Sequence, residues 1–300
     1  MLNCYHFAVA GIGERRQLGH GNMENLTLLS VHACYGLAAC LFVVAAAWRN
    51  ASQKDLSEDA PFGRVSVAIY RPLDLIGFSI IVLLFYLLAA GNAGIKDPKI
   101  TLSTILGSIG MQVFIVGIVV MMISRRANLV DWLGLKWVKW PQVFWIAPAT
   151  VVSMWIVFSL LFSLGYMDLM ERLGVEKVQD AVAMFQKEND PVVLGWMAFA
   201  AVIVAPICEE IVFRGYFYPI AKRFAGPWIS ALFAALIFTA AHGSMSVLLP
   251  LFIFGIVLAR IYEATGSLWA PISIHCLFNG ATVLIQLLMR YFEIPEDFGS

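Results

Sequence analysis

Long runs of apolar residues dominate this sequence and restrict what it can fold into. Because the hydrocarbon core of a bilayer is about 30 Å thick, a helix needs roughly 20 apolar residues to cross it. Eight stretches reach or approach that length: 26–48, 74–92, 102–123, 143–166, 192–213, 228–242, 246–262 and 267–289. We therefore predict an all-α fold, a polytopic membrane helix bundle with about eight transmembrane helices.

The composition agrees with a multi-pass integral membrane protein and argues against other classes. Of the 300 residues, 60% are hydrophobic and only 13% are charged, whereas soluble domains average about a quarter charged. The 20 basic and 20 acidic residues cancel, so there is no basic field for nucleic acid. The five cysteines show no paired spacing that would indicate a disulfide framework. We expect a protein of the bacterial inner membrane, with membrane lipids around it.

The sequence divides into five parts. Residues 1–22 lack the apolar core of a signal peptide, and we expect a disordered leader or a start codon assigned too far upstream. Residues 23–166 hold the first four predicted spans. Residues 167–191 form an extramembrane loop or an amphipathic helix at the membrane surface. Residues 192–290 form the helical core with the candidate site, and residues 291–300 form a tail.

The fifth predicted span carries three ionisable residues within six positions, Glu209, Glu210 and Arg214. Each charge at mid-bilayer costs about 2.5–3.5 kcal/mol on insertion scales. Glu210 and Arg214 are spaced i, i+4 with the acid first, so they can form an ion pair. Glu209 is turned about 100° away from that pair and cannot share it equally. One acid is thus expected to be structural and the other functional, unless the trio only packs helices together.

Two histidines and an asparagine lie in later apolar spans. Phe238 and His242 end the sixth span, and the eighth span carries His275 and Asn279 at i, i+4, on one helix face. Peptide hydrolysis needs an activated water and donors for the carbonyl oxygen as it becomes anionic. A carboxylate withdrawn from water is a competent base near neutral pH. His242 can hold the same water, while the pair in the eighth span can form an oxyanion hole.

The motif order E-E-x-x-x-R, F-x-x-x-H and H-x-x-x-N resembles the CPBP family of intramembrane glutamic endopeptidases. That family comprises the type II CAAX prenyl proteases and their bacterial relatives, also called Abi proteins. The resemblance covers about residues 190–290 and implies a peptidase without cofactor or metal. Its substrate would be a protein or peptide, which is prenylated for some family members. The implied roles are water activation by Glu209 and His242, an oxyanion hole from His275 and Asn279, and support from Glu210, Arg214 and Phe238.

Two other functions stay open at this stage. A zinc hydrolase would use Glu209 or Glu210 with His242 and His275, which is an acceptable ligand set, although no H-E-x-x-H motif is present. A non-catalytic bacteriocin self-immunity scaffold or a transporter would use the same groups for packing or proton relay.

Either enzyme requires the side chains to meet. Simple alternation of spans would put His242 and His275 at opposite ends of their helices. The H-G-S-M-S turn after the sixth span must therefore lie within the membrane thickness, beside a water-filled cavity.

Overall fold

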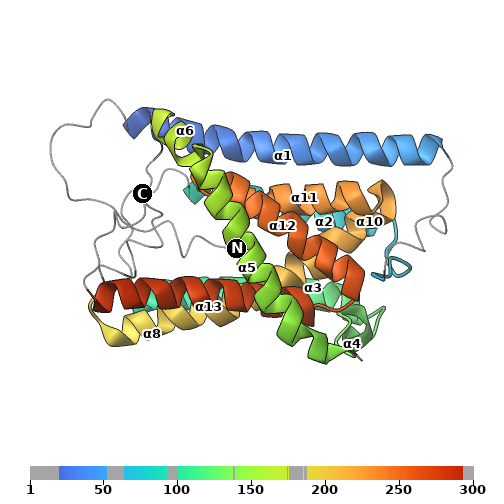
Figure 1. Ribbon diagram of the computed structural model, residues 1–300. Coiled ribbons are helices and arrows are strands. Elements are labelled where there is room, and N and C mark those ends of the chain that lie inside the picture. The colour runs from blue at the N-terminus through green and yellow to red at the C-terminus, as the bar shows by residue number, and fades with distance from the viewer. Residues whose placement is uncertain are drawn as a thin grey trace.

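The structure is a computed structural model that describes residues 20–52, 64–92, 101–137, 139–173, 175, 185 and 188–292. Throughout these ranges the regular structure is helical, with no strand (Figure 1). Within the described residues, seven helices are long and apolar enough to cross a membrane. The prediction of an all-α, multi-pass membrane bundle is therefore confirmed. The exception among the eight expected spans is the sixth, which forms a helix of 15 residues, or about 22 Å.

The described part of the N-terminal half contains four long helices and three short connecting ones. The long helices are α1 (His20–Ala51), α2 (Asp74–Asn92), α3 (Leu102–Ser124) and α5 (Val143–Ser163). The short ones are α4 (Leu129–Trp132), η2 (Trp140–Gln142) and α6 (Tyr166–Arg172). Residues 1–19 of the expected leader, most of 174–187 in the expected loop, and 293–300 of the expected tail lie outside the described residues.

One continuous helical run, Pro191–Ala225, carries both acids. Asp190 begins it, because its carboxylate accepts from the Val192 N–H at 2.8 Å. Gly226 ends it with a φ of 81°, which suits glycine. In order, the segments are α8 (Pro191–Phe199), the π-helical η3 (Ala200–Val204), α9 (Ala205–Glu210), the π-helical η4 (Ile211–Phe217) and α10 (Tyr218–Ala225).

The last three helices are α11 (Pro227–Ala241), α12 (Leu248–Thr265) and α13 (Trp269–Tyr291). α11 and α12 are joined by a short link and pack together as a helical hairpin. A Cβ added at Gly255 would lie 3.0 Å from the Cβ of Ala235, so small residues allow this close approach. In Figure 1, α1 lies along α11, and α5 crosses the bundle against α13.

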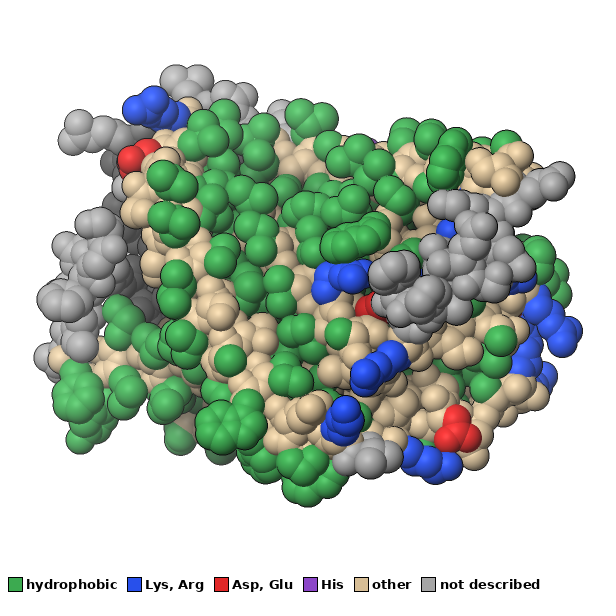
Figure 2. All heavy atoms as spheres, turned by 45° about the vertical axis from the view of Figure 1, so that its right-hand side comes forward, with side chains coloured by type: hydrophobic (Ala, Val, Ile, Leu, Met, Phe, Trp, Pro, Cys, Tyr) green, Lys and Arg blue, Asp and Glu red, His purple; other side chains and the backbone are tan. Residues whose placement is uncertain are grey.

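The packed centre of the bundle is aromatic. Phe213 and Phe217 of η4 meet Phe85 of α2 edge-to-face, and Phe213 meets Phe238 of α11 in the same way. Large hydrophobic side chains are also exposed on the outside of many helices. Figure 2 shows hydrophobic side chains covering much of one face, with most of the visible Lys and Arg side chains toward its right-hand half. An apolar exterior of this kind suits contact with lipid.

Candidate active site

Glu210 is held by two buried partners. Its Oε1 accepts from Arg214 Nη1 at 2.8 Å and lies 2.9 Å from His275 Nδ1. Arg214 and Glu210 are only 1% and 0% exposed. Because an ionised carboxylate only accepts hydrogen bonds, Nδ1 of His275 is the donor in this contact. The i, i+4 ion pair expected from the sequence is present, and it also fixes a histidine from the last helix.

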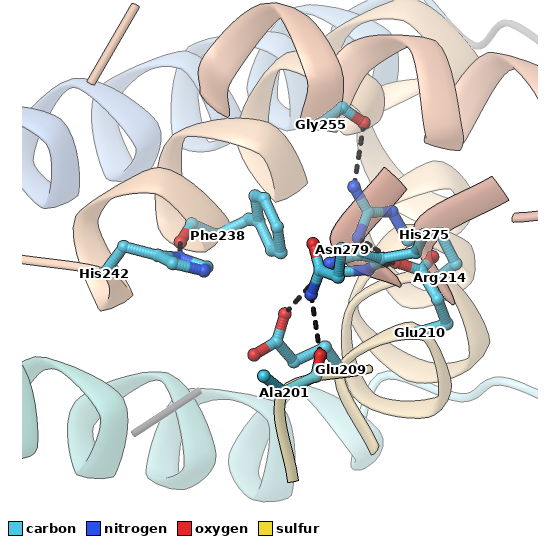
Figure 3. Close-up of polar contacts among 9 residues, drawn as sticks. All are labelled: Ala201, Glu209, Glu210, Arg214, Phe238, His242, Gly255, His275 and Asn279. Atoms are coloured by element: carbon cyan, nitrogen blue, oxygen red, sulfur yellow. Dashed lines mark hydrogen bonds and ion pairs between the residues drawn. The ribbon is translucent and has the colours of Figure 1, made fainter. Parts of the chain in front are cut away.

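Arg214 joins the acid-bearing helix to the hairpin. Its Nη2 donates to the carbonyl oxygen of Gly255 in α12 at 3.0 Å. The guanidinium also lies over the ring of Phe238 in α11, 4.7 Å from the ring centroid. A buried ion pair is stable only when its remaining hydrogen-bonding groups are satisfied, and these contacts provide part of that satisfaction (Figure 3).

Glu209 lies on the other side of the same histidine. Its Oε2 is 3.8 Å from Nε2 of His275, and its side chain is almost fully buried. His275 therefore stands between two acids, with Nδ1 on Glu210 and Nε2 facing Glu209. The two acids differ in environment, as the sequence analysis expected: Glu210 is fixed by Arg214, whereas Glu209 lies outside that ion pair.

His242 follows α11 directly and has a defined tautomer when neutral. Its Nδ1 lies 2.8 Å from the carbonyl oxygen of Phe238, which can only accept, so Nδ1 is the donor. The Nε2 lone pair of the neutral ring is then left for another donor. Figure 3 shows the His242 ring and the Glu209 carboxylate pointing toward the same region beside Phe238. α11 ends at Ala241, and Gly243, with a φ of 59°, lets the chain turn directly after His242.

Phe238 is the apolar centre around which the polar groups gather. Its ring centroid lies 4.7 Å from that of His242 and 5.9 Å from that of His275. The same ring packs edge-to-face on Phe213 and under the guanidinium of Arg214. Phe238 therefore packs between the two imidazoles and covers one face of the Arg214 guanidinium.

Asn279 lies one turn after His275 on α13, on the same helix face. Its Nδ2 donates to the carbonyl oxygen of Ala201 in η3 at 2.8 Å. One of its two amide hydrogens is thus engaged, and the other is left for a further acceptor. The structure brings all seven residues singled out in the sequence to one region (Figure 3).

Sequence reasoning missed two aromatic residues that support the site. The Tyr70 hydroxyl donates to the carbonyl oxygen of Gly215 at 3.1 Å and accepts from Trp132 Nε1 at 2.7 Å. Burial raises the pKa of the Tyr70 phenol well above its ordinary value, which keeps it a donor. Phe254 of α12 packs edge-on against His275, with ring centroids 5.4 Å apart. No local motif marks either position.

The zinc alternative depends on three ligands that converge on one point. Among the side chains that the structure describes, no group of three or more His, Cys, Asp or Glu residues is placed to hold a metal ion. Both ring nitrogens of His275 already face carboxylates. The zinc ligand set considered from the sequence therefore has no support in the geometry of the described residues.

The segment that holds the site resembles a known protein family. Residues 191–281 match the family described as type II CAAX prenyl endopeptidase Rce1-like. This segment is therefore similar to that family. The Rce1-like segment contains every residue of the candidate site, from Glu209 to Asn279, so the resemblance inferred from the motifs is confirmed.

Three relatives resemble the chain in part. It is 31% identical over 99 residues to the putative membrane peptidase YdiL of Bacillus subtilis. The alignment covers 32% of this chain and 41% of that protein. It is 34% identical over 96 residues to the membrane-embedded CAAX protease MroQ of Staphylococcus aureus. This alignment covers 30% of this chain and 39% of that protein. An uncharacterized 24.3 kDa protein of Escherichia coli is 28% identical over 144 residues, which is 44% of this chain and 66% of that protein.

The chain thus spans about two fifths of the length of the first two relatives. No solved structure gives a significant match.

Proposed function

We propose that this protein is an intramembrane glutamic endopeptidase, which hydrolyses a peptide bond of a membrane-associated protein or peptide. The observation that supports this most is the meeting of two acids, two imidazoles and an amide from three separate segments inside an apolar bundle. Ionisable groups are expensive in a membrane and are retained there mainly for function. The similarity of residues 191–281 to the Rce1-like family supports the same activity.

In the proposed reaction Glu209 is the base. It removes a proton from a water molecule while the water oxygen attacks the carbonyl carbon of the substrate. The Nε2 lone pair of His242 accepts a hydrogen bond from the same water and holds it in line for attack. The C–N bond of the tetrahedral intermediate then breaks, and the leaving amine takes the proton that Glu209 received.

The groups on α13 are the proposed donors to the oxyanion. Asn279 has a second amide hydrogen beyond the one given to Ala201. His275 can donate from Nε2 only when that nitrogen also carries a proton, because its Nδ1 donates to Glu210. Glu210 and Arg214 act as positioning residues that hold this ring. Donors fixed in advance around a developing charge are worth several kcal/mol in other hydrolases.

The proposed substrate class follows from the surroundings of the site. The acids lie within an apolar bundle, so the scissile bond must come to the membrane. The matched family is described as a type II CAAX prenyl endopeptidase, and a lipid chain would bring a peptide to this depth. We therefore propose membrane-associated proteins or peptides, lipidated or not, as substrates.

The test compares membranes of cells that contain the wild-type protein, Glu209→Gln or Asp131→Asn. Glu209→Gln keeps the shape of the side chain and removes the base. Asp131 is a matched acidic control, because it is exposed and pairs with Lys136 at the surface. We expect proteomics of new peptide ends to reveal cleavage products with wild type and Asp131→Asn and to lose them with Glu209→Gln. Products that persist at the wild-type level in the Glu209→Gln membranes would rule out the peptidase.

A further inference from the structure

Gln112 is a buried polar residue outside the Rce1-like segment. It lies near the middle of the 23-residue helix α3, and its side chain is only 1% exposed. Its Oε1 has no hydrogen-bond partner among the residues that the structure describes. A polar amide at mid-membrane depth is expensive to bury without a partner, and such groups usually serve a function.

The packing of α3 puts Gln112 near the level of the acids. Ile105, one end of the buried face of α3, belongs to an apolar cluster with Met197 and Ala201. Toward the other end, the Met122 sulfur accepts from the Tyr216 hydroxyl at 3.8 Å. Helix α3 and the acid-bearing run Pro191–Ala225 therefore lie side by side and run in the same direction.

The position of Gln112 along the acid-bearing run can be stated more closely. Gln112 lies ten residues before Met122 on α3, and Pro206 of α9 lies ten residues before Tyr216. Because the two helices run in the same direction, Gln112 lies near the level of Pro206, about one turn before Glu209. α3 contacts α9, the segment that carries both acids.

We propose that Gln112 is a ligand-binding residue of the active site, contributed by the N-terminal half of the chain. Its Oε1 accepts a hydrogen bond from a donor in the site, either water or a peptide N–H of the substrate. Only the second source rests on the proposed peptidase function. A buried water commonly satisfies such a group, since it bonds to polar atoms that protein neighbours leave unsatisfied.

Gln286 offers a matched control for this proposal. It is another buried glutamine whose Oε1 lacks a partner within the described ranges. It lies on α13 seven residues after Asn279, beside Val283 and Leu287 of the apolar cluster at the α8 end. If loss of a buried glutamine only disturbs the fold, substitutions of Gln112 and Gln286 should have the same effect. If Gln112 acts in the site, only its substitution should affect the site.

The first experiment measures water access and needs no cleavage. Single cysteines are introduced into the full-length protein after its five native cysteines are replaced. They are then treated with a membrane-impermeant, cationic methanethiosulfonate reagent, which reacts with hydrated thiolates. The controls on the same helix are Phe114→Cys, on an exposed apolar position, and Val119→Cys, in the packed core. We expect Gln112→Cys to react at least about tenfold faster than both. A rate equal to that of Val119→Cys would overturn the proposal, whether or not the protein is a peptidase.

The second experiment separates the two donors and tests the role in cleavage. An added farnesylated peptide should slow labelling of Gln112→Cys if the donor is a substrate N–H, and leave it unchanged if the donor is water. Turnover of the membrane proteins whose cleavage depends on Glu209 is compared among Gln112→Leu, Gln112→Glu and Gln286→Leu. We expect Gln112→Leu to slow turnover about tenfold, Gln112→Glu to recover most of it by keeping an acceptor, and Gln286→Leu to match wild type. Equal turnover for Gln112→Leu and Gln286→Leu would also overturn the proposal.

Discussion

Asn279 donates a hydrogen bond to the backbone carbonyl of Ala201, and this contact fixes the last helix against the acid-bearing one. In the π-helical stretch around Ala201, carbonyls pair with the N–H five residues later, as Ala205 does with Ala200. The fifth residue after Ala201 is Pro206, which has no N–H. The side chain of Asn279 therefore replaces a donor that proline removes.

The same arrangement occurs again in this helical run. Gly215 lies near the end of η4, and Pro219, four residues later, cannot give the Gly215 carbonyl the i, i+4 donor of an α-helix. The Tyr70 hydroxyl occupies that position at 3.1 Å. At both prolines, a side chain from another part of the chain, Asn279 or Tyr70, donates to a carbonyl of the acid-bearing run.

Replacing Asn279 by Leu should lower stability by about 1–3 kcal/mol, because the carbonyl of Ala201 is left buried without a donor. Pro206→Ala restores an N–H five residues after Ala201 and should reduce that loss. The measurement is thermal unfolding in detergent of both single variants and the double variant. Equal losses from Asn279→Leu with and without Pro206→Ala would contradict the proline explanation.

Replacing Arg214 by Met should destabilise the protein by about 3–5 kcal/mol, because Glu210 is left as a buried charge without its counterion. The double variant Glu210→Gln, Arg214→Met removes both charges and should be more stable than Arg214→Met alone. Denaturant unfolding in detergent measures the difference. If the double variant loses as much stability as Glu210→Gln and Arg214→Met lose together as single variants, the two residues do not form a coupled ion pair.

Replacing Tyr70 by Phe should lower stability by about 1–3 kcal/mol at neutral pH, since the Gly215 carbonyl and the Trp132 N–H both lose a partner. The effect should depend on pH in one direction. Burial raises the pKa of folded Tyr70 above its ordinary value of about 10. Its contribution is therefore full below pH 10, and it is lost above that value as the unfolded chain releases the proton more readily.

The pH dependence is measured as the difference in unfolding free energy between wild type and Tyr70→Phe. This difference should be constant from pH 6 to about pH 9 and should shrink above pH 10. A difference that grows with rising pH would have the wrong sign for a phenol held as a donor.

Strong chelators should leave cleavage unchanged, because the proposed reaction activates water with Glu209 and His242 alone. Treatment with 1,10-phenanthroline, compared with its non-chelating isomer, tests this on the cleavage products defined by the Glu209→Gln comparison. Loss of cleavage that added Zn²⁺ restores would instead support the zinc alternative.

The sequence was sufficient to predict the helical spans, because hydrophobic length is a local property. It also placed Glu210 opposite Arg214, since i, i+4 spacing fixes both residues on one helix. It could not predict that His275 lies between the two acids, because that depends on how α13 packs against α9. Tyr70 and Gln112 escaped for the same reason, since neither stands in a motif.

The meeting of His242 with the acids could be stated only as a requirement. Its fulfilment depends on the 15-residue length of α11, which ends before it could cross a bilayer. Helix length is visible in the sequence only to within a few residues, so the depth of the following turn was not predictable. The catalytic role of each residue stays a prediction until the variants above are measured.

Arg214 contacts α9 through Glu210, α12 through the Gly255 carbonyl and α11 through the ring of Phe238. The Arg214 guanidinium therefore holds these three segments together. A motion that admits the proposed substrate is then expected at contacts that do not involve Arg214, such as those between α5 and α13.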